Sequence, residues 1–290
     1  MLDGTARCWG YGSSGQLGVN STQDAAIPVT VWRDASGGTL TGVVDLACGV
    51  SHTCALLNDT TMRCWGFNAG TQGRLGDGTT TDSNTPVVVT AVTGNVTSIA
   101  GGGGTTTCAL LANGTTQCWG PRPAVIAGTR DAACGPDHCC VVMAADNSTQ
   151  CWGSGIQGQL GNNGIVSSTS PVTVVTSGGT ALTGVSSLGL AGFHSCAVVA
   201  GGELGDNSAM GAGNAGTLVP SSFVLLSNPA SAAPPRLAGV RTVRGAHFTT
   251  CALLETGALA CWGYNNYGQL GGGTNTDKAV AVPVARGLGG

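Results

Sequence analysis

Apolar and polar positions alternate over short distances along this chain. Short runs rich in Val, Thr and Trp are bounded by Gly, Asn, Asp and Pro, as in TPVVVTAV (85–92), SPVTVVT (170–176) and AVPVA (281–285). No segment sustains the 3.6-residue period of an amphipathic helix, whereas short apolar runs between turn residues are typical of strands. The pattern therefore predicts a chain built almost entirely of β-strands and turns.

One phrase recurs through the sequence. It reads CALLNDTTMRCWG at 54–66, CALLANGTTQCWG at 108–120 and CALLETGALACWG at 251–263. The first cysteine of each copy falls at positions that are 54, 32, 56 and 55 residues apart: Cys54, Cys108, Cys140, Cys196 and Cys251. The Cys-Trp-Gly at 8–10 is the tail of a further copy, so the chain starts within a repeat, and we expect a fragment of a longer sequence.

Each full copy has the same parts in the same order. An apolar lead-in with a glycine, such as VVDLACGVSHTC (43–54), precedes the two-cysteine phrase. A Gly-rich segment such as YGSSGQLG (11–18) or SGIQGQLG (154–161) follows, and a polar stretch leads to a short extended run. A unit of about 55 residues with four short strands favours a β-propeller over a solenoid, whose units are usually shorter.

The sequence thus predicts an all-β fold, a β-propeller of six to seven four-stranded blades, incomplete at the blade where the two chain ends would meet. We expect residues 1–290 to form a single domain. Its repeat units are 1–42 (partial), 43–95, 96–127 (shortened), 128–184, 185–238 (degenerate) and 239–290.

The paired cysteines face each other if each phrase forms a hairpin. Opposed residues of antiparallel strands have Cα atoms about 4.5 to 5.5 Å apart, which a disulfide can bridge. We therefore predict the disulfides Cys54–Cys64, Cys108–Cys118, Cys140–Cys151 and Cys251–Cys261. Reduced core thiols and a metal site are the alternatives, and the separation of the pairs between repeats argues against metal.

The other five cysteines fit this scheme less well. Cys8 has its partner outside the sequence, and Cys196 begins a degenerate copy without Cys-Trp-Gly. Cys48 and Cys134, six residues before a hairpin cysteine, resemble small buried residues. Cys139 adjoins Cys140 and competes with it for Cys151.

Five Asn-X-Ser/Thr sequons are candidates for glycosylation: Asn20, Asn58, Asn95, Asn113 and Asn147. Three of them, Asn58, Asn113 and Asn147, fall at the tips of cysteine hairpins, where a glycan would project into water. Disulfides together with exposed sequons indicate a secreted or cell-surface protein.

Composition excludes several classes of function. Only 9% of residues are charged, the net charge is -3, and the eleven Lys and Arg residues are scattered. Nucleic acids and anionic membranes are bound through clustered basic residues, so neither is an expected partner. No apolar run approaches the roughly 18 residues needed to span a bilayer, so membrane insertion of this segment is not expected. The first ten residues lack the basic and apolar regions of a signal peptide.

The ordered motifs resemble the regulator of chromosome condensation repeat family. They are GVSHTCALL (49–57), CWGFNAGTQGRLGDGTT (64–80), TPVVV (85–89) and CWGYNNYGQLGGGTNT (261–276). The resemblance covers nearly the whole chain and implies a propeller, typically of seven blades, that offers loop faces to protein partners. Similar propellers include a nucleotide exchange factor for a small nuclear GTPase, a plant ultraviolet photoreceptor and a secreted β-lactamase inhibitor. The paired cysteines mark this chain as a divergent member of secreted type.

No catalytic or metal-binding set stands out, and we expect neither an enzyme nor a cofactor. The motifs of serine hydrolases, zinc proteases and nucleotide-binding enzymes do not occur. The four histidines each belong to a different repeat and read as structural: His52, His138, His194 and His247. Four acidic residues fall in polar connections that read as solvated turns: Asp77, Asp82, Asp206 and Asp277.

Residues that depart from the repeat are the candidates for binding, because the repeated structure does not require them. Arg74 stands where the other copies have Gln, Trp32 and Arg33 lie in the first long connection, and Arg122 lies in the shortened unit. Tyr264 and Tyr267 follow a Trp-Gly step, as Tyr11 and Phe67 do, and serve either binding or packing. Aromatic and Arg side chains are the usual anchors of interfaces.

These observations predict an extracellular, non-enzymatic scaffold that presents loop faces to a protein or glycan. A structural or adhesion module of a larger surface protein is the second hypothesis. A regulator of a small GTPase, similar to a nucleotide exchange factor, is the third.

Overall fold

The computed structural model consists of antiparallel strands and the turns between them. It describes residues 4–70, 73–101, 104–199, 203–204, 239–246, 249–266 and 270–284. Within these ranges every regular element is a strand, and no helix is long and apolar enough to cross a membrane. The all-β prediction is confirmed.

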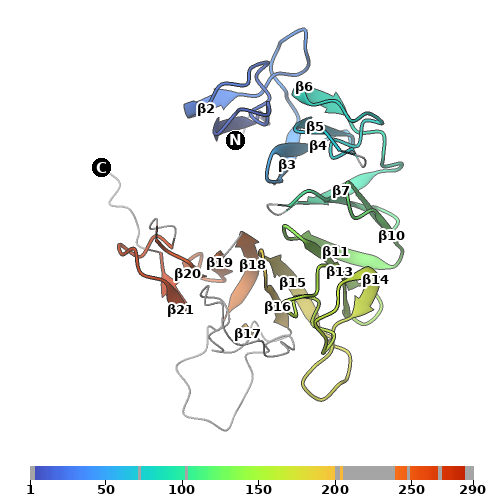
Figure 1. Ribbon diagram of the computed structural model, residues 1–290, viewed down its shortest axis with the longest axis vertical. Helices are drawn as coiled ribbons and strands as arrows, with labels where there is room; N and C mark the ends of the chain where they lie inside the picture. The colour runs from blue at the N-terminus through green and yellow to red at the C-terminus, as the bar shows by residue number, and fades with distance from the viewer. Residues whose placement is uncertain are drawn as a thin grey trace. The chain divides into compact units, whose positions relative to one another are not determined.

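The chain divides into two compact units, residues 1–132 and 133–290, with the boundary inside strand β11. In unit 1, a two-stranded sheet is followed by two four-stranded sheets, ordered β3-β4-β5-β6 and β10-β9-β8-β7 (Figure 1). The strands are β1 (Arg7–Gly10), β2 (Ala25–Thr30), β3 (Val43–Cys48), β4 (His52–Leu57), β5 (Met62–Gly66), β6 (Ser83–Val88), β7 (Val96–Ala100), β8 (Thr107–Leu111), β9 (Thr116–Trp119) and β10 (Ala124–Ile126).

Unit 2 repeats the same sheet pattern. Its sheets are ordered β11-β12-β13-β14, β15-β16-β17 and β18-β19-β20-β21. The strands are β11 (Thr129–Cys134), β12 (His138–Met143), β13 (Thr149–Gly153), β14 (Ser168–Thr173), β15 (Val185–Leu190), β16 (Ser195–Val199), β17 (Glu203–Leu204), β18 (Val240–Ala246), β19 (Thr249–Leu254), β20 (Leu259–Gly263) and β21 (Lys278–Pro283). The first sheet of unit 1 and the β15–β17 sheet have fewer than the expected four strands among the residues described.

The cysteine phrase forms the middle hairpin of its sheet. In the β4–β5 hairpin Cys54 lies opposite Cys64, and Leu57 N–H bonds to Thr61 O to close the tip. Thr60 has the left-handed φ of 68°, and Asp59 Oδ1 accepts the N–H of Thr61, so local polar contacts hold this tight turn. Lead-in strand β3 pairs with β4 on its other side. We call the Leu57 side of these sheets the tip end and the His52 side the lead-in end.

The shortened repeat keeps four strands by leaving out a segment. After Trp119 only four residues, 120–123, precede the three-residue strand β10, which pairs with β9 through Ala124 and Cys118. The Gly-rich segment and polar stretch of the other repeats have no counterpart here. The spacing of 32 residues between Cys108 and Cys140 therefore reflects a shorter connection and not a missing strand.

Five disulfides are present, and they support the pairing of the cysteines. Four close the middle hairpins: Cys54–Cys64, Cys108–Cys118, Cys140–Cys151 and Cys251–Cys261. The fifth joins Cys134 to Cys139. Cys134 is buried, as expected, and it is bonded to Cys139, so Cys139 does not take the place of Cys140 opposite Cys151. The register explains this pairing: in β13, Trp152 lies opposite Cys139 and Cys151 lies opposite Cys140, so Cys139 is left for Cys134 of the other neighbouring strand, β11.

Candidate functional site

Histidines of the lead-in motif join neighbouring repeats. His52 Nε2 lies 2.8 Å from Thr107 Oγ1, and His194 Nε2 lies 2.7 Å from Thr250 Oγ1. In each pair the hydroxyl belongs to the residue before the first hairpin cysteine of the next repeat. His138 makes the same contact with Ser195, at 2.6 Å. We call these contacts histidine latches; His247 lies outside the residues described.

The buried setting of His52 favours its neutral form. Burial and, to a smaller degree, the positive charge of Arg74 lower the pKa of His52 to about 4. Burial likewise lowers the pKa of His194. Gly49 makes room for the His52 ring, because a Cβ at that position would overlap the imidazole. The G-x-x-H motif is therefore structural: a glycine, and a histidine that is neutral at physiological pH.

The Gly-rich segment holds the tryptophan of the next repeat. Gln16 O accepts hydrogen bonds from Trp65 Nε1 at 2.9 Å and from Thr53 Oγ1 at 3.0 Å. Trp119 Nε1 likewise donates to Arg74 O at 2.9 Å. Gly18 and Gly76 lie against these indoles, where a Cβ would come within 2.7 and 2.8 Å of the ring nitrogens. We call each such arrangement a tryptophan latch.

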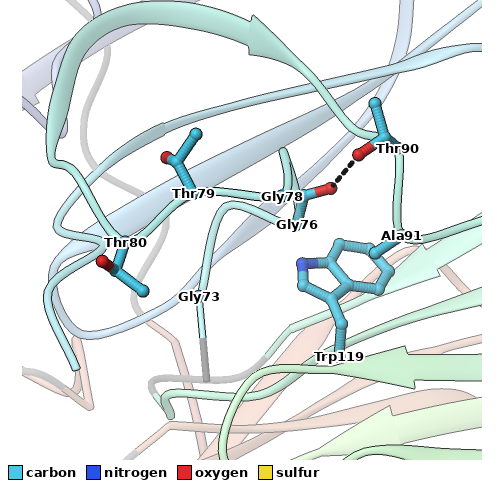
Figure 2. Close-up of a pocket in the computed structure, with 8 residues that line it drawn as sticks. All are labelled: Gly73, Gly76, Gly78, Thr79, Thr80, Thr90, Ala91 and Trp119. Atoms are coloured by element: carbon cyan, nitrogen blue, oxygen red, sulfur yellow. Dashed lines mark hydrogen bonds between the residues drawn. The ribbon is translucent and has the colours of Figure 1, made fainter. Parts of the chain in front are cut away.

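A hollow of about 320 Å³ lies beside the second tryptophan latch. Figure 2 shows the Trp119 indole next to Gly76 and Ala91, with Thr79, Thr80 and Thr90 around the opening. Gly73, Gly76 and Gly78 have φ values of 50°, 65° and 82° and add no side chain to it. No lining residue is charged, so the hollow suits a small uncharged group.

The connection that follows the hollow is shorter than its counterparts. Equivalent backbone bonds join Trp32 N–H to Gly18 O, Thr90 N–H to Gly76 O and Val175 N–H to Gly161 O. After Trp32 and after Val175 the chain makes a small extra hairpin, with bridges Trp32–Thr39 and Val175–Ala181. After Thr90 it runs to β7 within a few residues. The hollow thus lies at the connection that lacks the extra hairpin.

Arg74 lies at the lead-in end of unit 1, above an aromatic ring. Its guanidinium carbon is 4.6 Å from the centroid of Phe67, within the range of a cation–π contact. Phe67 N–H bonds to Ser51 O at 2.7 Å, next to Val50, whose side chain is 62% exposed. Val50, Phe67 and Arg74 together are called the Arg74 surface below.

A buried asparagine shapes the loop that carries Arg74. Asn68 is fully buried, and its Oδ1 accepts the N–H of Leu75 at 2.8 Å. Its Nδ2 donates to Thr79 O at 3.1 Å, while Asp82 Oδ1 accepts the Asn68 N–H at 2.6 Å. Leu75, the residue after Arg74, is therefore held by the buried Asn68.

Position 74 is Arg where other repeats have Gln, and this difference changes the hydrogen bonds that the side chain can make. Gln16 Oε1 accepts the N–H of Ser14, and Gln159 Oε1 accepts that of Gln157, so each glutamine caps its own turn. Arginine has no acceptor and cannot make this bond. Among the residues described, no carboxylate forms an ion pair with Arg74. Such a cation beside apolar surface suits an acidic group of a partner.

The other binding candidates lie in other segments of the chain. Trp32 and Arg33 belong to the small hairpin after β2, where Arg33 Nε bonds to Asp34 Oδ2 at 2.9 Å. Arg122 is half-buried in the connection of the shortened repeat, and Tyr264 is half-buried in unit 2. Tyr267 lies outside the residues described.

The unpaired cysteines and the acidic residues of the connections are also among the sequence predictions. Cys8, Cys48 and Cys196 are free, and Cys48 is exposed where a buried residue was expected. Burial raises the pKa of Cys8 and of Cys196 to about 11, which keeps both thiols protonated and poorly nucleophilic. Asp82 and Asp277 accept backbone N–H groups and so hold their loops together; Asp206 lies outside the described ranges.

Sequence reasoning missed the latches and the asparagine loop, although a signal was present. Asn68 and Asn265 both follow Trp-Gly by two residues, and in each the side-chain oxygen accepts the N–H of the buried leucine of the Gly-rich segment. In each of the three histidine latches, the residue directly before the first hairpin cysteine of the next repeat carries a hydroxyl group. These residues stand out only when the repeats are aligned, because a single repeat does not show that the same residue type returns at the same position.

Family comparison agrees with this architecture. Residues 3–56 and 64–109 match the model described as "Regulator of chromosome condensation (RCC1) repeat", and a second model of that description matches residues 43–72 and 245–269. The ultraviolet-B receptor UVR8 of Arabidopsis thaliana is 27% identical over 98% of this chain. The E3 ubiquitin-protein ligase HERC2 of Homo sapiens is 32% identical over 40% of it. The chain spans 67% of the receptor and 2% of the ligase.

Solved structures share the fold over almost the whole chain. Yeast RCC1 (Prp20), crystallised with Kap60 bound, superposes with a TM-score of 0.72 at 20% identity over 98% of this chain and 71% of its own. Prp20p of Saccharomyces cerevisiae gives 0.71 at 20% identity, over 98% of this chain and 73% of its own. The β-propeller prediction is confirmed.

Proposed function

Because the chain has a β-propeller fold and matches RCC1 repeat models over part of its length, we propose that it is a secreted or cell-surface, non-catalytic scaffold that binds a partner protein through the Arg74 surface. Arg74 carries the proposal. It replaces a structural glutamine, lies over Phe67 and has no ion-pair partner among the residues described. The favoured partner presents a carboxylate next to an apolar group, which would meet Arg74 and Val50 respectively.

The five disulfides support an extracellular setting. Disulfides persist in oxidising compartments and are rare in the cytosol. Alkylation followed by non-reducing mass spectrometry of the natural protein should find ten cysteines in disulfides and three free thiols. Thirteen free thiols would instead favour the cytosolic regulator of a small GTPase, a hypothesis supported otherwise only by the fold shared with yeast Prp20. An adhesion module remains compatible with the disulfides and differs in needing attached domains.

The binding surface is tested by returning Arg74 to the repeat's own residue. We expect Arg74→Gln to lower the affinity for the partner at least about tenfold, as loss of a charged anchor does, without lowering stability. Arg33→Gln is the matched control, because Arg33 is exposed and already paired with Asp34. The measurement is titration of the purified variants against the protein recovered by photo-cross-linking from the extracellular fraction. Equal affinities of the Arg74 variant and the wild type would refute this surface.

A further inference from the structure

Three of the five sequons lie together at the tip end of unit 1. Asn58 lies in the β4–β5 turn and Asn113 in the β8–β9 turn. Asn95 connects them: its Oδ1 is 3.5 Å from Thr60 Oγ1, in the sequon of Asn58, and its backbone O accepts the N–H of Ala112 at 2.9 Å. All three asparagines are exposed. We call Asn58, Asn95 and Asn113 the tip rim.

The contacts of these asparagines are compatible with modification. An N-linked glycan attaches to Nδ2, whereas Asn95 receives Thr60 through Oδ1, and Asn113 Oδ1 accepts the N–H of Thr115 at 3.0 Å. The Asn58 side chain lies against Gly42, where a Cβ would come within 2.7 Å of Oδ1. A glycine at that position leaves the carboxamide room at the surface.

Asn147 occupies the equivalent turn of the β12–β13 hairpin in a different environment. Its side chain is half-buried, and the two following sequon residues are buried, with Ser148 8% and Thr149 0% exposed. A glycan on Asn147 would have to leave through packed surface. The chain thus contains its own control for the tip rim. Asn20, in the connection between β1 and β2, is exposed but makes no contact with the rim that the structure records.

We infer that Asn58, Asn95 and Asn113 carry N-linked glycans that cover the tip rim and restrict partner binding to the lead-in end, where the Arg74 surface lies. The inference rests on the proposed secretory location. Strand β4 separates the two ends by about 20 Å, since six residues rise about 3.3 Å each. Glycans at one end therefore leave the other open.

The modification needs a lipid-linked oligosaccharide diphosphate as donor and the transferase of the secretory route. A bond forms between Asn Nδ2 and the anomeric carbon of the sugar, and the bond from that carbon to the diphosphate oxygen breaks. The lipid diphosphate leaves, and one Nδ2 proton passes to base. The Asn-X-Ser/Thr sequence is the acceptor signal for this transfer.

Site occupancy is the first test. The full 290-residue chain is expressed through the secretory route of a eukaryotic host, glycans are released enzymatically in heavy-oxygen water, and the labelled aspartates are mapped by peptide mass spectrometry. We expect Asn58, Asn95 and Asn113 to be occupied several-fold more than Asn147. The matched control is the triple variant Asn58→Gln, Asn95→Gln, Asn113→Gln. Equal occupancy of all four sites, or an empty tip rim, overturns the inference.

Disulfide mapping of the same sample separates this inference from the proposed function. If the disulfides are formed but the tip rim carries no glycans, the glycan inference is overturned and the proposed function is not. For the natural protein, free thiols overturn the extracellular scaffold itself, together with the inference that depends on it.

Accessibility of Arg74 is the second test and needs no known partner. The probe is phenylglyoxal, which modifies arginine, and the rate at Arg74 is read by peptide mapping. We expect enzymatic removal of the native glycans to leave this rate unchanged. Ala69→Asn creates an Asn-Gly-Thr acceptor at an exposed position of the loop that carries Arg74, and a glycan there should slow modification several-fold, whereas Ala69→Gln should not. A several-fold rise on removing the native glycans would overturn the inference.

Discussion

Trp65 and Trp152 occupy the same position in two repeats and are both buried, at 0% and 1% exposure. Trp65 Nε1 donates to Gln16 O of the preceding repeat. Trp152 Nε1 has no hydrogen-bond partner among the residues described. The repeat that precedes Trp152 is the shortened one, which lacks the Gly-rich segment whose carbonyl serves as acceptor elsewhere.

The hydrogen bonding of the repeat tryptophan is thus completed by the preceding repeat, as at Trp65 and Trp119. Burial of the indole comes from the apolar contacts of its own repeat, but its polar atom is satisfied only where the preceding copy supplies a carbonyl. An unsatisfied buried donor costs about 1 to 3 kcal/mol. Trp152 therefore carries this cost, even though its own repeat retains the cysteine phrase and its Trp-Gly.

Acid is expected to act most strongly on the latched junctions. His52 has a pKa of about 4 when folded and about 6.5 when unfolded. Between these values the unfolded chain binds a proton that the folded chain does not, so stability is full above pH 6.5 and falls as the pH drops towards 4. The loss from His52 is on the order of 3 kcal/mol, because each pKa unit corresponds to about 1.36 kcal/mol.

The measurement is urea unfolding at pH 7 and pH 4.5. His52→Gln should reduce the difference in unfolding free energy between the two conditions. Arg74→Gln should reduce it less, since it removes only the smaller cause of the pKa shift. A difference that is the same in wild type and His52→Gln would contradict a buried neutral histidine at this latch.

Gly76→Ala is expected to break the second tryptophan latch at a cost of about 2 to 3 kcal/mol. The new Cβ would lie 2.8 Å from Trp119 Nε1, and the φ of 65° disfavours any side chain. Gly78→Ala is the matched control: its φ is 82°, but its Cβ meets only Thr90 Oγ1, at 3.7 Å, so about 1 kcal/mol is expected. Chemical denaturation measures both, and equal losses would show that backbone strain alone acts.

Trp65→Phe and Trp152→Phe test the comparison directly. Both changes remove similar buried area, but the first also removes a hydrogen bond and the second removes an unsatisfied donor. We expect Trp65→Phe to destabilise by about 1 to 2 kcal/mol more than Trp152→Phe. Unfolding free energies of the two variants give this difference, and a larger loss for Trp152→Phe would mean that its indole N–H is satisfied.

Local patterning was enough to predict the fold class and the four disulfides that close the hairpins. Apolar runs, turn residues and a ten-residue cysteine spacing act within one hairpin, and a hairpin of given turn length has one register that buries its apolar face. Cys54 therefore faces Cys64 by local geometry alone. The pairing of Cys134 with Cys139 escaped because it depends on which strand lies beside β12, and two neighbouring cysteines compete on spacing alone.

By itself the sequence determined that this chain is an all-β repeat protein with cysteine-closed hairpins, because those features depend on residues close together in the chain. Only the tertiary structure decided how Arg74 and Phe67 form one surface, which tryptophan lacks an acceptor and which sequons share a rim. Phe67 and Arg74 meet within one folded loop, the tryptophan bonds join neighbouring repeats, and the sequons come from different turns. The length of each connection decides which residues meet, and this becomes visible only when the repeats are packed together.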